Sequence, residues 1–184
     1  MMFKNFSKNK RKLPFKICEY YQFKPEFNIH KVIEDLLLGI PQEYLEGLGA
    51  VVICDSDSFM EHYETDHTPL GRYNHPIEKD ELPWIEVVID TLIQELGGFA
   101  KIPFIRDLII GNTLYHEIGH HINRKESLEK AQAEKIAEKW RKKLSKYYLK
   151  RKYWYLFFPL LLLILPFRRL IEKKLKNKTS VALW

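Results

Sequence analysis

Hydrophobic positions recur at helix or strand spacing over much of this 184-residue chain. Residues 29–38 (IHKVIEDLLL) carry apolar side chains at the helical period, and Gly39 and Pro41 predict the end of that helix. A short second helix is expected in the PQEYLEGLG segment that follows. Residues 50–54 (AVVIC) predict a buried strand, and residues 71–75 (GRYNH) and 84–91 (WIEVVIDT) predict two more.

The second half of the chain is helical in pattern. We expect one long helix over residues 103–123, with Pro103 at its start, and another over residues 126–150. Residues 55–71 (DSDSFMEHYETDHTPLG) are polar and irregular, which predicts a surface loop. The order of helix, strands and two long helices predicts an α+β fold. We divide the chain into a basic segment over 1–28, a domain over 29–150 and a tail over 151–184.

Charge is segregated along the chain, although the formal net charge is only +6. Six Lys/Arg and no acid give residues 1–16 a charge of +6, and thirteen Lys/Arg against one acid give residues 141–184 a charge of +12. The middle, with eleven basic and twenty-three acidic residues, carries −12. An acidic body argues against a nucleic-acid-binding face, so we expect no specific nucleic-acid partner.

The N-terminal residues lack the apolar run of a secretory signal, and two cysteines are too few for a disulfide framework. Both features predict a reducing, cytoplasmic compartment. Residues 153–167 (YWYLFFPLLLLILPF) are uncharged between basic flanks, and as a helix they reach about 22 Å against roughly 30 Å of hydrocarbon. Pro159 and Pro166 also interrupt a straight helix. We expect a shallow or re-entrant anchor at the inner face of the membrane, with a buried core helix or a true span as alternatives.

The residues most suited to chemistry are His116-Glu117-Ile118-Gly119-His120. On a helix, His116 and His120 project from one face, where both imidazoles can bind one metal ion. Glu117 lies about 100° round the helix, from where its carboxylate can act on a water at the ion without ligating it. A third ligand is needed, and the next predicted helix offers Glu126, Glu129, Glu134 and Glu138.

Together these residues resemble the gluzincin class of zinc metallopeptidases, whose HExxH helix is followed by a helix bearing ExxA/S-D/E. Residues 134–138 (EKIAE) match the second pattern. The resemblance implies that His116, His120 and Glu134 hold one zinc ion and that Glu117 is the general base in peptide-bond hydrolysis by a metal-activated water. It also implies that Glu138 orients a ligating histidine. Glu129 stays the rival third ligand.

The resemblance further implies a zincin-like domain over residues 29–150, in which a short sheet packs on the HExxH helix and its edge strand holds an extended peptide. The run from Trp84 (WIEVVID) and the run GRYNH are two candidates for that edge. Small residues at Gly119 and Ala137 are expected to let the two helices approach closely. The donor that stabilises an oxyanion stays open among Tyr73, Tyr115, Tyr147 and Tyr148.

We therefore expect a membrane-associated zinc metallopeptidase that acts on a peptide or protein substrate and contacts lipid through its tail. Two alternatives stay open: a non-catalytic metal-binding regulatory or scaffolding module at the membrane surface, and an adaptor that binds nucleic acid or lipid headgroups through its basic ends. His121 is expected to be a bystander. A scattered set of polar residues favours solvated side chains over a second metal site: His62, His67, His75, Asp55, Asp57 and Asp66.

Overall fold

The computed structural model describes residues 12–63, 68–76 and 81–155. Contacts divide the chain into one unit over Met1–Tyr148 and another over Leu149–Trp184. Most of the expected membrane anchor at 153–167 lies outside the described residues. Among the residues that are described, no helix combines the length and the apolarity needed to cross a membrane.

The first unit is a mixed α/β structure built on a four-stranded sheet in the order β1-β2-β4-β3. Strands β1 (Lys16–Tyr20), β2 (Ala50–Cys54) and β4 (Trp84–Val88) run parallel, and β3 (Gly71–Asn74) pairs antiparallel with β4. In the β3–β4 register, Arg72 lies opposite Glu86 and Tyr73 opposite Ile85. The sheet therefore ends at β3 on one side. Of the two candidate runs, GRYNH forms an edge strand, and the run from Trp84 does not, because β4 is internal.

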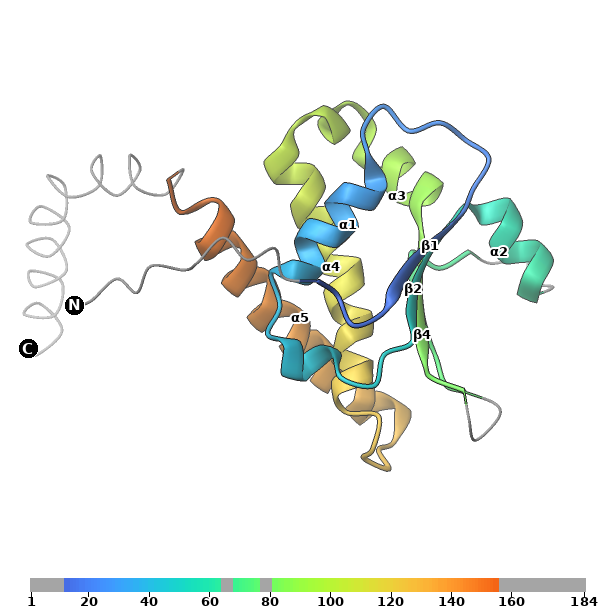
Figure 1. The fold of residues 1–184 in the computed structure, drawn as a ribbon, viewed down its shortest axis with the longest axis vertical. Helices are drawn as coiled ribbons and strands as arrows, with labels where there is room; N and C mark the ends of the chain where they lie inside the picture. The colour runs from blue at the N-terminus through green and yellow to red at the C-terminus, as the bar shows by residue number, and fades with distance from the viewer. Residues whose placement is uncertain (1–11, 64–67, 77–80, 156–184) are drawn as a thin grey trace, which may run out of the picture. The chain divides into compact units, whose positions relative to one another are not determined.

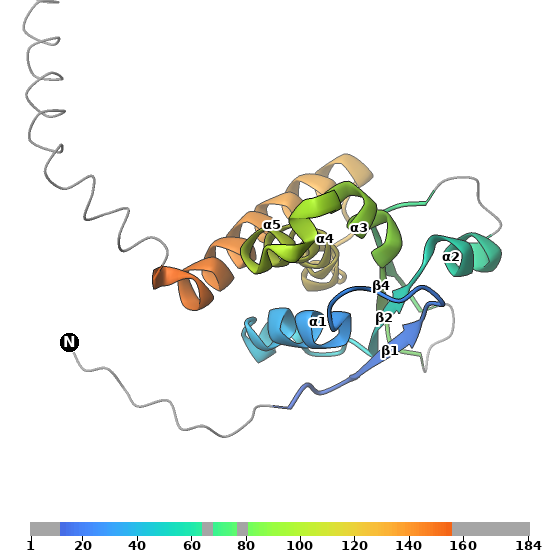
Figure 2. The ribbon, with the colours of Figure 1, turned by 90° about the horizontal axis from the view of Figure 1, so that it is seen from above.

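Helices cover both faces of this sheet unequally. Helices α1 (Ile29–Leu38) and α4 (Pro103–Ile122) lie on one face, and α2 (Ser56–Tyr63) lies on the other (Figures 1 and 2). Short elements connect them: a 3-10 helix at Gln42–Leu45, α3 (Ile89–Leu96) and a second 3-10 helix at Gly97–Lys101. Helix α5 (Lys130–Lys152) follows α4. The core between sheet and helices is apolar, with fully buried side chains at Ile33, Leu36, Val51, Ile53, Ile85, Val87, Ile110, Leu114 and Ile118.

The elements with strong periodicity form where the sequence predicts them. Residues 29–38 and 50–54 are α1 and β2, and α4 covers all but the last residue of the predicted 103–123 helix. The predicted strand over residues 84–91 ends at Val88, where α3 begins.

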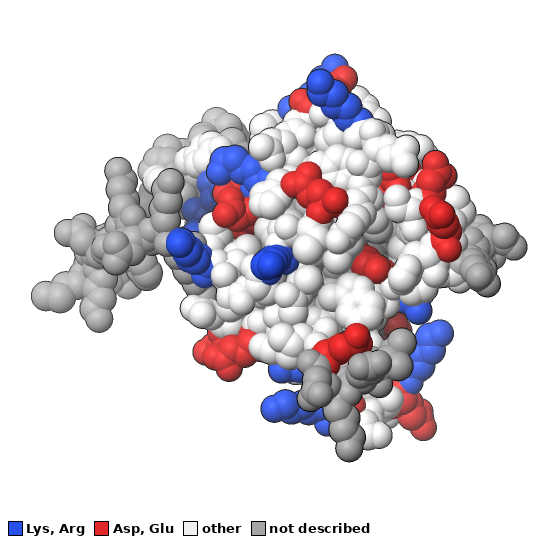
Figure 3. All heavy atoms as spheres, turned by 45° about the vertical axis from the view of Figure 1, so that its right-hand side comes forward, with Lys and Arg blue, Asp and Glu red and all other residues white. Residues whose placement is uncertain are grey.

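The expected loop over residues 55–71 is wrong in its first half, because α2 forms there. Asp55 caps that helix, since its Oδ1 accepts the backbone N–H of Ser58 at 3.0 Å. On the face drawn in Figure 3, acidic and basic side chains of the described residues are interspersed.

Candidate metal centre

Two helices bring three potential ligands together. His116 and His120 stand one turn apart on α4 with their Nε2 atoms 3.2 Å apart. From α5, Glu134 places Oε2 3.2 Å from His116 Nε2 and Oε1 3.6 Å from His120 Nε2. Two ligands that each lie about 2.0–2.1 Å from an ion at the tetrahedral angle are about 3.3 Å apart. The two imidazole nitrogens therefore have the spacing of neighbouring ligands at a tetrahedral ion, and one oxygen of Glu134 lies near each of them. The ligand atoms of the three residues lie within 4.8 Å of one another, so the group could hold a metal ion.

Close packing of α4 on α5 puts Glu134 in reach of the histidines. A Cβ added to Gly119 would lie 2.7 Å from Ala137 Cα and 2.8 Å from Ala137 O, and Ala137 is fully buried. Gly119 follows His116 by three residues, and Ala137 follows Glu134 by the same interval, so the contact lies about one helical turn from His116 on α4 and from Glu134 on α5. The expected role of these two small residues is confirmed.

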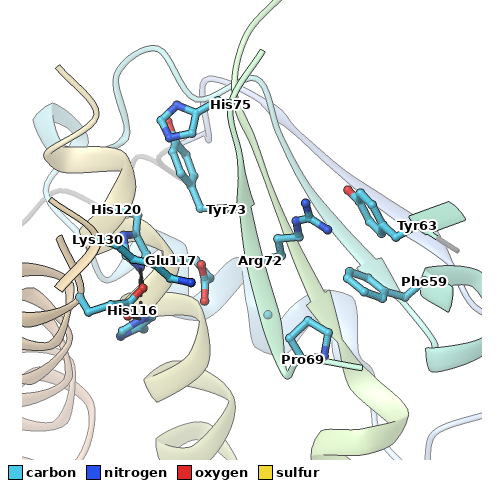
Figure 4. A pocket seen from close by; sticks show the side chains of 12 residues that line it. Phe59, Tyr63, Pro69, Arg72, Tyr73, His75, His116, Glu117, His120 and Lys130 are labelled. Atoms are coloured by element: carbon cyan, nitrogen blue, oxygen red, sulfur yellow. Dashed lines mark hydrogen bonds and ion pairs between the residues drawn. The ribbon is translucent and has the colours of Figure 1, made fainter. Parts of the chain in front are cut away.

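Glu117 lies between the ligand cluster and the edge strand. Its side chain points into the cleft beside His116 and His120 (Figure 4), and the residue is only 8% exposed. The backbone N–H of Tyr73 donates to its carboxylate. Burial raises the pKa of Glu117 to about 7, against the opposing effect of the Tyr73 N–H and with a smaller contribution from the charge of Glu134. A carboxyl group with this pKa suits proton transfer near neutral pH.

The close approach of β3 to α4 depends on a second glycine. A Cβ on Gly71 would lie 2.7 Å from Thr113 Cγ2 and 3.2 Å from Glu117 Cγ. Because this position has no side chain, the edge strand lies directly beside the carboxylate. The sequence interpretation assigned no role to Gly71. The available signal for a close approach was a glycine as the first residue of the predicted GRYNH strand.

The three ligands and Glu117 share one open cleft of about 790 Å³. The far wall, on the other side of β3, is formed by α2 and the residues before β3 (Figure 4). Sequence reasoning did not assign several residues of this cleft: Phe59, Tyr63, Pro69, Arg72, His75 and Lys130. Alternation along β3 was the available signal for the residues of this run, because side chains two apart on a strand, such as Tyr73 and His75 in the predicted strand, share a face.

Neither of the two other carboxylates considered on or before α5 belongs to the ligand group. The carbonyl of Glu129 accepts the backbone N–H groups of Gln132 and Ala133 at the helix start, and Glu129 is not part of the ligand cluster. Both oxygens of Glu138 accept from Arg141 at 2.6 Å. These hydrogen bonds, helped by Lys142, lower the pKa of Glu138 to about 2. Glu138 therefore pairs with cations of its own helix. It does not orient a ligating histidine in this structure, contrary to the expectation.

Of the four tyrosines considered as oxyanion donors, only Tyr73 lines the cleft. The hydroxyl of Tyr115 donates to Leu36 O at 3.2 Å and that of Tyr148 to Asp107 Oδ2 at 2.9 Å, both in the core. Tyr147 is half exposed and does not line the cleft.

His121 differs from its neighbours in the motif because it is fully buried. Its Nε2 lies 3.0 Å from Glu46 O, and since a carbonyl only accepts, Nε2 carries the proton. Its Nδ1 is then an acceptor, 3.4 Å from the Tyr73 hydroxyl. Burial, and the charge of Arg124, lower the pKa of His121 to about 4. His121 is thus a bystander to the ligand group, as expected, and it contacts β3 through the Tyr73 hydroxyl.

The scattered polar residues do not form a second metal group within the described ranges. Asp55 caps α2, and the ring of His62 packs edge-on against Tyr63. His75 lies against the Tyr73 ring, with 4.8 Å between ring centroids. His67 and Asp66 lie outside the described residues.

No family model matches the chain, and comparison with curated proteins finds no significant match. The interpretation of the site therefore depends on the residues and their geometry.

Proposed function

We propose that this chain is a zinc-dependent metallopeptidase with a zincin-like, gluzincin-type site. His116, His120 and Glu134 hold one zinc ion, and Glu117 is the general base. The observation that carries the proposal is the convergence of two imidazoles and one carboxylate, with ligand atoms within 4.8 Å of one another, in the cleft that also contains Glu117. Two imidazoles, one carboxylate and an open side are the donor set of a catalytic zinc site.

When bound, zinc supplies Lewis acidity, which polarises a carbonyl group and acidifies water. Glu117 accepts a proton as the water attacks a peptide carbonyl, and it delivers that proton to the leaving amine. The Tyr73 N–H holds the Glu117 carboxylate toward the cleft, and burial raises the pKa of this carboxyl group to about 7. The chain thus supplies both the ligands and the proton carrier that amide hydrolysis needs.

The substrate is a peptide or protein segment that binds in extended form along the free edge of β3. The Leu70 carbonyl accepts from Val88 N–H on β4, whereas the Tyr73 N–H reaches Glu117 on the other side. Backbone groups of alternate strand residues point to opposite edges, so Gly71 and Tyr73 present theirs away from β4. Because the Tyr73 N–H is engaged by Glu117, a peptide that pairs there uses the remaining outward backbone groups of Gly71 and Tyr73. It then lies beside the Glu117 carboxylate, and these backbone hydrogen bonds supply affinity.

The proposal also places the protein in the cytoplasm at the inner face of the membrane. The apolar run at 153–167 and the +12 charge of residues 141–184 support binding to anionic lipid. Sedimentation of the full chain with vesicles tests this point. We expect binding to vesicles that contain phosphatidylserine, weaker binding to phosphatidylcholine vesicles, and release by salt. Equal binding to both would contradict the electrostatic part.

The catalytic proposal is tested on the full chain by metal analysis and peptide hydrolysis. We expect one zinc per chain, loss of zinc in Glu134→Gln, and normal zinc content in the control Glu129→Gln. Glu117→Gln keeps the metal and lowers the rate of hydrolysis by a factor of about 10²–10⁴. Unchanged turnover in Glu117→Gln contradicts its role as a base. One tightly bound zinc without hydrolysis of any peptide favours the non-catalytic metal-binding module instead.

A further inference from the structure

The wall of the cleft opposite the metal ligands carries a cation, Arg72, that has no carboxylate partner among the described residues. Arg72 is exposed, and its guanidinium carbon lies 4.0 Å from the centroid of the Tyr63 ring. Within the described ranges, no Asp or Glu lies within ion-pair distance of it. Stacking on an aromatic ring holds an arginine in place and leaves its N–H groups free to bind a planar anion.

The nearest carboxylate in the sheet does not neutralise Arg72. Glu86 lies opposite Arg72 in the β3–β4 register, but it is buried and accepts from three neutral donors. Its oxygens bind Tyr63 Oη at 2.7 Å, Asn74 Nδ2 at 3.0 Å and Trp84 Nε1 at 3.2 Å. This network fixes the Tyr63 ring on which Arg72 stacks. The aromatic support is therefore rigid, while the guanidinium faces the cleft.

The remaining charges of the cleft also favour an anion. Its two carboxylates, Glu117 and Glu134, are committed to proton transfer and to the metal ion. Lys130, the other Lys or Arg residue of the cleft lining, is exposed and forms no ion pair within the described part of the chain. Once the carboxylates are engaged, the surface that a ligand meets is positive on both sides of the β3 edge.

The position of Arg72 relates it to the bond that is cleaved. Gly71 and Tyr73 flank Arg72, and both lie against Glu117: a Cβ on Gly71 would lie 3.2 Å from Glu117 Cγ, and Tyr73 N–H donates to its carboxylate. In an antiparallel pair, residues directly opposite each other project their side chains from the same face of the sheet. A bound peptide residue opposite Arg72 therefore directs its side chain to the guanidinium and lies next to the scissile bond.

We propose that Arg72 is a specificity-determining residue that selects substrates with a carboxylate side chain adjacent to the cleaved bond. This inference rests on the proposed peptidase function and adds the substrate class to it. Arg72 acts through binding alone and takes no part in proton transfer.

The test uses zinc-loaded full chain and quenched fluorescent peptides of uniform neutral sequence, in which a single Glu, Gln or Lys is moved along the peptide. Mass spectrometry locates each cleavage. For the wild type, we expect kcat/KM for Glu to exceed that for Gln about fivefold at one position next to the cleaved bond, the scale of a partly exposed ion pair. Arg72→Gln should abolish this ratio, Arg72→Glu should favour Lys, and Arg72→Lys should retain a preference for Glu.

Lys139→Gln, an exposed charge outside the cleft, is the matched control and should leave the ratio unchanged. Because each variant is compared with itself on two peptides, partial loss of folded protein cancels. Cleavage with no preference for Glu at any position in the wild type overturns the role of Arg72 while leaving the peptidase intact. A preference that persists in Arg72→Gln also overturns it. Absence of cleavage of every peptide overturns the peptidase proposal itself.

Discussion

The helix contact at Gly119 offers a way to perturb the metal site without touching a ligand. In Gly119→Ala, the new methyl would lie 2.7 Å from Ala137 Cα, where nonbonded carbons prefer about 3.5–4.0 Å. Both groups belong to helix backbones, so α4 and α5 must separate by about 1 Å. Overpacking of this kind costs about 1–3 kcal/mol, and the helix propensity of alanine returns about 1 kcal/mol. We expect a net loss of about 1 kcal/mol in the free energy of unfolding.

The effect on metal binding should exceed the effect on folding. Glu134 lies one turn from Ala137, so a separation of about 1 Å moves its carboxylate away from His116 and His120. Metal–ligand distances tolerate only about 0.2 Å. We expect zinc affinity to fall at least about tenfold, the size of effect produced by disturbing groups that orient metal ligands. Competition with a chromophoric chelator measures the affinity, and thermal unfolding of the metal-free protein measures stability.

Gly111→Ala is the matched control because it makes the same change on the same helix. Its new methyl would lie 3.0 Å from Leu36 Cδ2, a side-chain end that can move. Zinc affinity should stay at the wild-type level in this variant, with stability unchanged or slightly higher. Wild-type zinc affinity in Gly119→Ala would refute the claim that this contact positions Glu134.

Three further predictions concern the fold. The pKa of buried His121 is about 4, whereas the ordinary pKa in the unfolded chain is about 6.5. As the pH falls, the unfolded state therefore binds the proton first, and the free energy of unfolding should decrease between pH 6.5 and pH 4. His121→Gln should flatten that part of a plot of the free energy of unfolding against pH. Burial and nearby carboxylates raise the pKa of Cys54 to about 12, so a maleimide at pH 8 should modify Cys18 and reach Cys54 only after unfolding; equal rates in the folded protein would contradict this. Tyr148→Phe removes the hydrogen bond to buried Asp107 and should lower the unfolding free energy in urea by about 1–3 kcal/mol, whereas an unchanged midpoint would assign this bond no net contribution.

Strong local patterns made several elements predictable. The apolar positions of residues 29–38, apart from Leu38, are the buried positions of α1, and AVVIC, a short β-type run, forms β2. Two of the elements that escaped prediction have weak local signals. Strand β1 is a half-exposed edge strand with little alternation, and α2 buries only Phe59. The Asp55-Ser56-Asp57-Ser58 run was the one local sign of that helix, as a cap.

The sequence by itself determined that His116 and His120 share a helix face and that Glu117 lies beside them, because a helix fixes residues four apart without help from the rest of the chain. The helical period also limited the third ligand to a few acidic residues near or on α5. It could not choose among them, since that choice depends on where a second helix lies. Tertiary packing made it: the Gly119–Ala137 contact brings Glu134 to the histidines. Packing also decided that β3 is the edge strand and that Arg72 stacks on Tyr63, because both depend on contacts between segments that no local pattern encodes.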